Sequence, residues 1–231
     1  MKGLDFVIYF TLSRPFISCT KILQIKPLLT FCDFCTMITK EVIKISTRQI
    51  LTIYILFFMF NILKINTKAP IFDLKGSQAG NMKQWKTEDF AGKWLVFFFY
   101  PADFTFVCPT EVKAFNELLP QFQAKNCEVV GCSVDSPFVH TAWAESLGGI
   151  DYPLLSDVHH TTSIDYNVFV DEDAQTLRGT FILNPEGILK WYCISDNNVG
   201  RNVDEILRTV DALQTGLLCP ANWKKGEKTL N

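Results

Sequence analysis

The stretch that decides this fold is Trp94-Leu95-Val96-Phe97-Phe98-Phe99-Tyr100, an unbroken apolar and aromatic run that ends directly before Pro101. A short run of this kind, without polar alternation, is typical of a strand that is buried on both faces. Such strands occupy the centre of α/β sheets, where helices cover the two sides. The run therefore predicts a central strand over residues 94–100.

Beyond this strand, the apolar residues recur at helical spacing. Pro109 suits the first turn of a helix, and the apolar positions that follow it are Val112, Phe115, Leu118, Leu119 and Phe122. Residues 128–134 predict the next strand, and a short helix is expected to follow through Trp143 to Leu147.

The C-terminal half predicts a hairpin and a closing helix. Asn184-Pro185-Glu186-Gly187 is a turn signal between the apolar runs 180–183 and 188–192. Apolar residues from Val203 to Leu213 then mark an amphipathic helix that Gly216 ends. The order β-α-β-α followed by β-β-α predicts the α/β class and a thioredoxin-like fold, with a central mixed sheet flanked by helices.

The charge of the chain is divided unevenly. Residues 1–68 contain nine Lys or Arg and three Asp or Glu, whereas residues 69–231 contain thirteen and twenty-one. The larger part is therefore acidic, which argues against nucleic acid as its partner. We expect residues 1–68 to be an N-terminal extension and residues 69–231 to be the thioredoxin-like domain.

The extension ends in the apolar run 50–63, for which three hypotheses stay open. The run is shorter than the roughly 20 apolar residues of a membrane-spanning helix and closer in length to the core of a signal peptide. About fifty residues precede it, however, and no small-x-small cleavage site follows it. The extension could be an upstream stretch wrongly read as coding, an internal membrane anchor or a targeting peptide. Without a credible signal, a reducing cytoplasm is the default location.

Eight cysteines are spread irregularly over the chain, unlike the disulfide framework of a small secreted domain. Cys32 and Cys35 form a lone CxxC inside the extension. A structural zinc site would need a second pair of ligands, and the sequence offers none. We therefore expect no bound metal.

Three other cysteines and the histidines are expected to have structural roles. Cys127, Cys132 and Cys193 fall on predicted strands or at their edges and are assigned to core packing. His140 stands alone, and His159-His160 lies in a polar stretch. Solvated or capping positions are expected for these histidines.

Cys108 differs from those cysteines because it follows a short loop and directly precedes Pro109. A cysteine at the N-cap of a helix meets unpaired N–H groups and the positive end of the helix dipole, which both favour an anion. A nearby guanidinium would favour the thiolate further and could polarise a bound substrate oxygen. A cysteine that only packs is the alternative, but the loop position and Thr105, three residues earlier, favour a reactive thiolate.

The segment 101–111 resembles the active-site signature of the peroxiredoxins. Pro101-x-x-x-Thr105-x-x-Cys108 matches that signature, and Asp103-Phe104-Thr105-Phe106-Val107-Cys108-Pro109-Thr110-Glu111 continues the match without a gap. Further matching motifs follow in order at residues 133–136, 177–181, 200–201 and 219–223. Residues 69–231 are most similar to the typical two-cysteine class, which includes bacterial alkyl hydroperoxide reductase C.

The resemblance implies a thiol-dependent peroxidase that reduces hydrogen peroxide and organic hydroperoxides in antioxidant defence and redox homeostasis. It gives Cys108 the role of the peroxidatic cysteine, whose thiolate attacks the O–O bond and becomes a sulfenic acid. It also implies that Thr105 orients the peroxide and that Pro101 shields the site. Arg178 would stabilise the thiolate and the developing negative charge.

Three more residues take roles from the resemblance. Glu111 and Arg201 match a pair that holds the Arg178 guanidinium in place. Cys219 matches the resolving cysteine, which comes from the partner subunit and forms an intersubunit disulfide. The resemblance thus implies a homodimer or a ring of dimers, recycled by thioredoxin or by a flavoprotein disulfide reductase. It implies no metal, haem or flavin cofactor, because sulfur itself carries the redox change.

Two departures from the class concern inactivation by excess peroxide. Residues 146–151 lack the Gly-Gly-Leu-Gly insertion of peroxide-sensitive members, and the sequence stops at Asn231, before their C-terminal helix with its Tyr-Phe pair. In the class these features pack over the active site and slow its local unfolding, which leaves the sulfenic acid open to overoxidation. We therefore expect resistance to overoxidation.

Two other functions stay open on the sequence alone. A disulfide oxidoreductase on the same fold would need a CxxC at this turn, and Val107-Cys108-Pro109-Thr110-Glu111 supplies one cysteine only. A chaperone or scaffold built from a ring assembly would not need the thiol. That function would persist after Cys108→Ser, whereas peroxidase activity would not.

Overall fold

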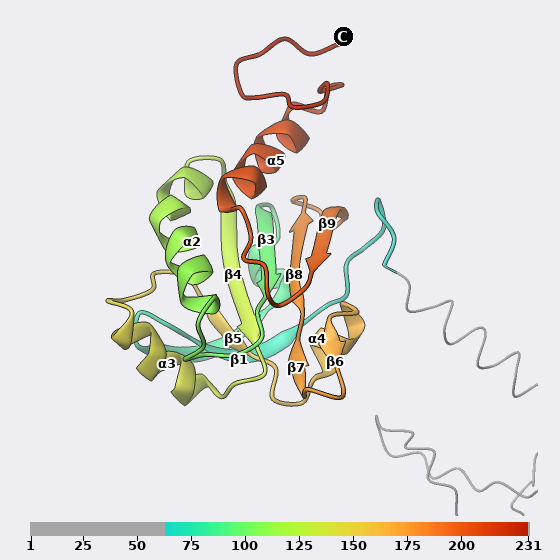
Figure 1. Ribbon diagram of the computed structural model, residues 1–231. Coiled ribbons are helices and arrows are strands. Elements are labelled where there is room, and N and C mark those ends of the chain that lie inside the picture. The colour runs from blue at the N-terminus through green and yellow to red at the C-terminus, as the bar shows by residue number, and fades with distance from the viewer. Residues whose placement is uncertain (1–62, 231) are drawn as a thin grey trace, which may run out of the picture. The chain divides into compact units, whose positions relative to one another are not determined.

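The structure, a computed structural model, describes residues 63–230 (Figure 1). A seven-stranded sheet has the strand order β2-β1-β5-β4-β3-β8-β9, and β6 and β7 form a separate two-stranded sheet. The strands are β1 (Asp73–Gln78), β2 (Asn81–Lys86), β3 (Trp94–Phe99), β4 (Cys127–Ser133), β5 (Leu154–Ser156), β6 (Phe169–Val170), β7 (Gln175–Thr176), β8 (Arg178–Leu183) and β9 (Leu189–Ser195). The helices are the 3-10 helix η1 (Thr87–Phe90) and the α-helices α2 (Cys108–Gln123), α3 (Pro137–Ser146), α4 (Thr161–Asp165) and α5 (Val203–Thr215).

β3 lies inside the sheet and is buried on both faces, as the apolar run 94–100 predicts. It pairs in parallel with β4 and antiparallel with β8, which makes the sheet mixed. Successive side chains of a strand point to opposite faces, so Val96 and Phe98 enter one core whereas Phe97 and Phe99 enter the other. The thioredoxin-like fold class that the sequence predicts is confirmed.

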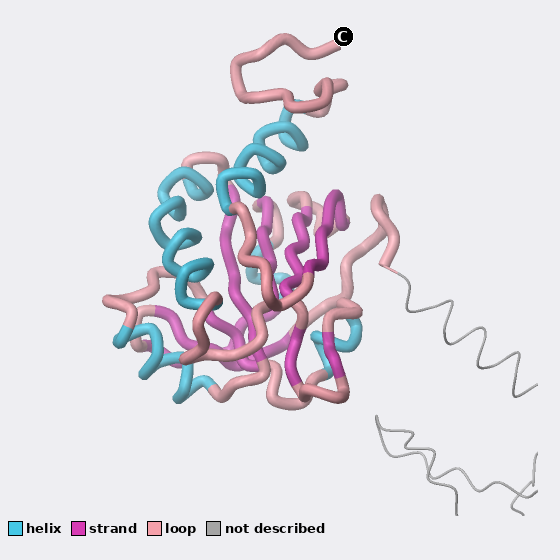
Figure 2. Tube along the Cα trace, viewed as in Figure 1, coloured by secondary structure: helices cyan, strands magenta, loops and turns pink. Residues whose placement is uncertain are grey.

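The helices α2, α3 and α5 cover the face of the sheet to which Phe98 points (Figure 1). The Phe115 ring of α2 stacks on the Phe98 ring, with 4.2 Å between centroids. Trp143 of α3 and Val210 of α5 belong to the same core. Figure 2 shows these helices in cyan beside the magenta strands that they cover.

The opposite face is closed by elements that the sequence pattern does not mark. Phe72 precedes the hairpin of β1 and β2, Phe90 ends η1, and Tyr166 follows the short helix α4. β2 exposes all of its side chains except Trp85, and β5 is three residues long. Neither strand has an alternation long enough to predict it.

The two glycines that the sequence places at a turn and at a helix end lie at those positions in the structure. Gly187 has a φ of 71° in the turn between β8 and β9, and Gly216 has a φ of 64° at the C-cap of α5. Both values lie in the left-handed region that glycine enters without a steric penalty. The predicted hairpin and closing helix are therefore confirmed.

The chain enters the domain by hydrogen bonds to the β8–β9 hairpin. The N–H of Asn66 donates to the Leu189 carbonyl at 2.8 Å, and the N–H of Leu189 donates to the Thr67 carbonyl at 2.9 Å. Among residues 63–230 no helix is long and apolar enough to cross a membrane. Residues 50–62 of the apolar run and the Cys32–Cys35 pair lie outside the described residues, and the domain boundary at residue 68 stays a prediction.

Two of the three cysteines assigned to packing are buried, and the third is not. Burial raises the pKa of Cys127 to about 12, and it also raises the pKa of Cys132. The prediction for Cys193 is wrong: its side chain is exposed. Cys193 lies on β9 at the edge of the sheet, where neighbouring residues Tyr192 and Cys193 are both exposed.

Phe98→Ala should lower the free energy of unfolding by about 3–5 kcal/mol, because it leaves a cavity under α2. Ile71→Ala is the matched control, because the Ile71 side chain is 73% exposed, and it should change the free energy by less than about 0.5 kcal/mol. Urea denaturation at one fixed protein concentration measures both. Equal losses in the two variants would contradict the assignment of Phe98 to the core.

Candidate active site

Cys108 is the first residue of α2, and its side chain is fully buried. The N-cap is Val107 and not Cys108, so the helix begins one residue earlier than the position of Pro109 predicts. The Val107 carbonyl accepts the N–H groups of Thr110 and Glu111 at 3.0 and 3.4 Å, which closes the first turn. The thiol therefore lies at the positive end of the helix dipole, where an anion is favoured.

Arg178 brings a guanidinium to this thiol from a neighbouring strand. Because β8 runs antiparallel to β3, the first residue of β8 lies where β3 ends and the loop to α2 begins. The Arg178 side chain is buried, and its Nη1 donates to Cys108 Sγ at 3.4 Å. A guanidinium beside a sulfur stabilises the thiolate form.

The Glu111 carboxylate holds two guanidinium groups together. Arg178 Nη1 donates to its Oε2 at 2.6 Å, and Arg201 Nε and Nη2 donate to Oε1 and Oε2, both at 2.9 Å. The backbone N–H of Arg201 also donates to Oε1, at 2.8 Å. Burial alone would raise the pKa of Glu111, but the hydrogen bonds and charge of Arg201, and then the charge of Arg178, lower it below its ordinary value. The carboxylate therefore stays ionised and fixes Arg178 against the thiol.

The loop between β3 and α2 carries the other two predicted site residues. Pro101, the second residue after the end of β3, is buried. Thr105 is half-buried, and its hydroxyl donates to the Ala102 carbonyl at 3.0 Å. Within residues 63–230 no hydrogen bond joins Thr105 to Cys108. The structure thus brings Cys108, Glu111, Arg178 and Arg201 into contact and places Pro101 and Thr105 in the adjoining loop.

A buried network that the sequence analysis missed fixes the same loop. His140 is not solvated and does not cap a helix, so that prediction is wrong: its side chain is fully buried. His140 Nδ1 lies 2.7 Å from Asp103 Oδ2, and Nε2 lies 3.0 Å from the Leu155 carbonyl oxygen. The Tyr100 hydroxyl donates to Asp103 Oδ1 at 2.9 Å. His140, Trp143 and Ala144 are the buried residues of α3, so an apolar face at i, i+3, i+4 was the signal available.

The hydrogen-bond partners orient the His140 ring. A carbonyl oxygen only accepts, so His140 Nε2 donates to Leu155. Nδ1 then faces the Asp103 carboxyl group. Burial raises the pKa of Asp103, and the hydrogen bond from His140 opposes that rise. Since the Asp103 N–H also donates to Asp135 Oδ2 at 2.8 Å, the loop is tied both to α3 and to the segment after β4.

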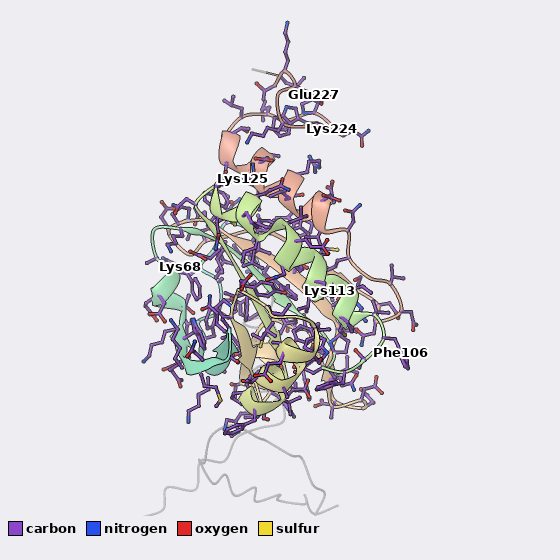
Figure 3. The ribbon with its side chains drawn as sticks, turned by 90° about the vertical axis from the view of Figure 1, so that its left-hand side faces the viewer. Lys68, Phe106, Lys113, Lys125, Lys224 and Glu227 are labelled. Atoms are coloured by element: carbon purple, nitrogen blue, oxygen red, sulfur yellow. The ribbon has the colours of Figure 1, made fainter. Side chains whose placement is uncertain are left out.

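Cys219 is not close to Cys108 in the same chain. α5 starts beside the active site, where Arg201 binds Glu111. At 1.5 Å per residue, its 13 residues then extend about 20 Å away before Cys219 is reached. Cys219 Sγ lies 3.5 Å from Thr215 Oγ1, on the last turn of α5. In Figure 3 the C-terminal segment with Lys224 and Glu227 lies far from the loop with Phe106.

A thioredoxin-like sheet with a buried cysteine at a helix N-terminus, contacted by a fixed guanidinium, defines the class of thiol-based redox proteins. A sequence profile described as the AhpC/TSA family matches residues 65–192. Peroxiredoxin-4 of Dictyostelium discoideum is 46% identical over 178 residues, which cover 73% of this chain and 69% of that protein. Peroxiredoxin-4 of Homo sapiens is 48% identical over 177 residues, which cover 72% of this chain and 65% of that protein.

A solved structure agrees with these relatives. The reduced 2-Cys peroxiredoxin of Plasmodium vivax superposes with a TM-score of 0.69 at 38% identity, over 73% of this chain and 93% of that chain. This chain therefore belongs to the AhpC/TSA family, as a peroxiredoxin of the typical two-cysteine class. It spans about two thirds of the length of the two curated relatives.

Glu111→Gln should lower the free energy of unfolding at pH 7 by about 3–5 kcal/mol, because two guanidinium groups then stay buried without a counter-charge. The pKa of Glu111 in the folded state lies below its ordinary value of 4.5. Its contribution is therefore present above that pH and is lost as the pH falls through the folded-state value. Urea denaturation between pH 7 and pH 3 should show the variant and the wild type converging in acid.

Glu205→Gln provides the matched control for that measurement. Glu205 forms an ion pair with Arg208 within α5, but 51% of its side chain is exposed. Its substitution should cost less than about 1 kcal/mol. A Glu111→Gln variant as stable as Glu205→Gln at pH 7 would disprove the structural role of the carboxylate.

Proposed function

We propose that this protein is a thiol-dependent peroxidase that reduces hydrogen peroxide and organic hydroperoxides, with Cys108 as the peroxidatic cysteine. The contact of 3.4 Å between Arg178 Nη1 and Cys108 Sγ, at the N-terminus of α2, carries this proposal. It combines the two devices that favour a thiolate, a helix dipole and a fixed positive charge. The Cys127 and Cys132 thiols instead lie on β4, away from a helix N-terminus, and burial raises the pKa of both.

In the first step, the Cys108 thiolate attacks one oxygen of the peroxide and the O–O bond breaks. The sulfur becomes a sulfenic acid, and the other oxygen leaves, with a proton, as water or an alcohol. Arg178 stabilises the negative charge that develops on the two oxygens. Thr105 orients the peroxide, since its hydroxyl donates to Ala102 and keeps its lone pairs available as acceptors.

Pro101, Glu111 and Arg201 have supporting roles in this proposal. Pro101 is buried near the start of the loop and shields the sulfenic acid from water. Glu111 and Arg201 hold the Arg178 guanidinium through the buried ion pairs. Their contribution is the fixed position of a charge that is already in place when the reaction begins.

In the second step, the Cys219 thiolate of a partner subunit attacks the sulfur of the Cys108 sulfenic acid. An intersubunit disulfide forms, and the hydroxyl group leaves with a proton as water. The position of Cys219 beyond the far end of α5 supports a partner over the same chain, because an intrachain bond would require α5 to unwind.

Exposed surfaces support assembly as a homodimer or a ring of dimers. β9 is an edge strand of the seven-stranded sheet, and its residues after Leu189, which itself bonds to Asn66 and Thr67, offer a template for pairing with another chain. Phe104, Phe106 and Phe138 are 62%, 98% and 70% exposed. Exposed aromatic side chains of this size are typical of protein interfaces.

The remaining parts of the proposal follow from the chemistry of the disulfide. A disulfide formed in each cycle must be reduced again, so we propose thioredoxin or a flavoprotein disulfide reductase as the electron donor. A reducing cytoplasm suits that cycle. The function served is antioxidant defence and redox homeostasis.

Hydrogen peroxide should convert the wild-type chain into a covalent dimer on a non-reducing gel. The dimer should be absent from Cys108→Ser and from Cys219→Ser, because each variant lacks one of the two sulfurs. Cys193→Ser is the matched control: this exposed thiol lies on an edge strand and should not be needed. Peroxide consumption by Cys108→Ser should fall to the background rate.

A covalent dimer that persists in both single variants would contradict the assignment of the two cysteines. Loss of the dimer in Cys193→Ser alone would identify an adventitious crosslink through the edge strand. Peroxide consumption unchanged by Cys108→Ser would refute the peroxidase mechanism itself.

A further inference from the structure

The Arg178 guanidinium is held from two sides, and only one of them is the Glu111 carboxylate. On the other side, the Asn197 carbonyl accepts hydrogen bonds from Arg178 Nε at 3.1 Å and from Nη2 at 2.9 Å. Nη1 is thereby left to reach Glu111 and the Cys108 sulfur. Two donors that converge on one oxygen fix the plane of a guanidinium as well as its position.

The backbone of Asn197 reaches this place because β9 ends beside the start of β8. Ser195, the last residue of β9, is the register partner of Arg178. The chain then leaves the sheet and brings the Asn197 carbonyl back to the guanidinium. The same segment approaches α2, since a Cβ added at Gly200 would lie 3.2 Å from Val107.

The Asn197 side chain ties this segment to the strand before Arg178. Its Nδ2 donates to the Thr176 carbonyl at 3.2 Å. The Thr176 hydroxyl in turn donates to the Tyr100 carbonyl at 2.8 Å, directly before the loop that carries Thr105. Asn197 is thus joined through Thr176 to the end of β3.

The other end of the same amide lacks a partner among residues 63–230. Asn197 Oδ1 is buried and accepts no hydrogen bond from these residues, although the side chain as a whole is only half-buried. Exchanging the oxygen and nitrogen would not relieve this, because the oxygen would then face the Thr176 carbonyl. An unpaired buried acceptor lowers stability. The amide therefore serves something other than stability alone.

We propose that Asn197 is a positioning residue for the peroxide-reducing step, which it serves by holding its own carbonyl against Arg178. This inference rests on the proposed function, because it assumes that Arg178 assists Cys108. The hydrogen bond from the side-chain amide to the Thr176 carbonyl fixes the peptide of residue 197, and the backbone carbonyl of Asn197 fixes the guanidinium. A side chain without the amide would leave the carbonyl free to shift, and Nη1 would lose its alignment with the sulfur.

The test is Asn197→Leu in the full chain, with Asn197→Ala as a second variant. The rate constant for the reaction with hydrogen peroxide should fall about tenfold, since small displacements of a catalytic group have effects of this order or larger. The midpoint of thermal unfolding should change little, because Leu removes the unpaired acceptor as well as the donor to the Thr176 carbonyl, and these two effects oppose one another. Stopped-flow fluorescence over a single turnover and thermal denaturation measure the two quantities.

Asn198→Leu is the matched control. Asn198 is the exposed neighbour, and its backbone N–H donates to Asp196. Its substitution should leave the rate constant within about twofold of the wild type. A double-mutant cycle with Arg178→Lys separates positioning from a general effect, because Lys cannot donate two hydrogen bonds to one carbonyl from a planar fork. In the Arg178→Lys background, Asn197→Leu should change the rate constant by less than about twofold.

The outcomes separate this inference from the function on which it rests. A rate constant that stays at the wild-type value in Asn197→Leu and Asn197→Ala, but falls in Arg178→Lys, would overturn this inference and leave the proposed function standing. Equal losses from Asn197→Leu in both backgrounds, with a lower unfolding midpoint, would show a purely structural role and also overturn it. A wild-type chain that does not react with peroxide would overturn the proposed function and this inference together.

Discussion

One carboxylate shared by two guanidinium groups organises this end of the fold. Both oxygens of Glu111 accept hydrogen bonds, from Arg178 on β8 and from Arg201 before α5. In a buried site, such an arrangement is tolerated only when every charged group is paired, since an unpaired ion would carry a large desolvation penalty. The three side chains therefore fix the positions of α2, β8 and the segment before α5 relative to one another. Cys108 lies inside this arrangement and takes its electrostatic environment from it.

A second set of contacts fixes the loop that enters α2. Asp103 is held by His140 and Tyr100, and its backbone is held by Asp135. On one side of the site, Glu111 thus fixes the positively charged Arg178 beside the sulfur. On the other side, the contacts of Asp103 fix the conformation of the loop. Asp103, Glu111, His140 and Arg178 are all buried within these two networks. A buried polar network in which some groups lack hydrogen-bond partners would be less stable than an apolar core. The side chains named in these two networks all have hydrogen-bond partners.

The features that could be predicted from the sequence are the local ones. The apolar run 94–100, the helical spacing after Pro109 and the glycine that ends α5 depend on periodicity and on backbone conformation, which a single sequence records. The motif around Cys108 was also predictable, because its residues are close along the chain. The ion pairs of Glu111 are a different case. They join residues 67 and 90 positions apart, so only the family resemblance pointed to them.

The residues that the sequence did not reveal are those whose role depends on burial. His140 looks like an isolated polar residue until α3 turns it inward with Trp143, and its partner Asp103 lies 37 positions earlier. Asn197 acts on Arg178 through a backbone carbonyl, which no residue type specifies. Cys193 was predicted to pack because it lies on a strand, but that strand is at the edge of the sheet. Strand order is a property of the whole fold, and a single strand does not record it.

The same contacts that favour a thiolate at Cys108 also oppose the proposed second step. The sulfur is fully buried, and the thiol of Cys219 lies beyond the far end of α5 in each chain. A disulfide between subunits therefore requires the first turn of α2 to open and the sulfur to leave Arg178. The cost of that opening is set by the buried ion pairs of Glu111 and by the hydrogen bonds of the loop at Asp103. A site held more firmly would react faster with peroxide but would form the intersubunit disulfide more slowly. A site held less firmly would do the reverse. The proposed cycle thus depends on contacts that are strong enough to position the guanidinium and weak enough to be broken once per turnover.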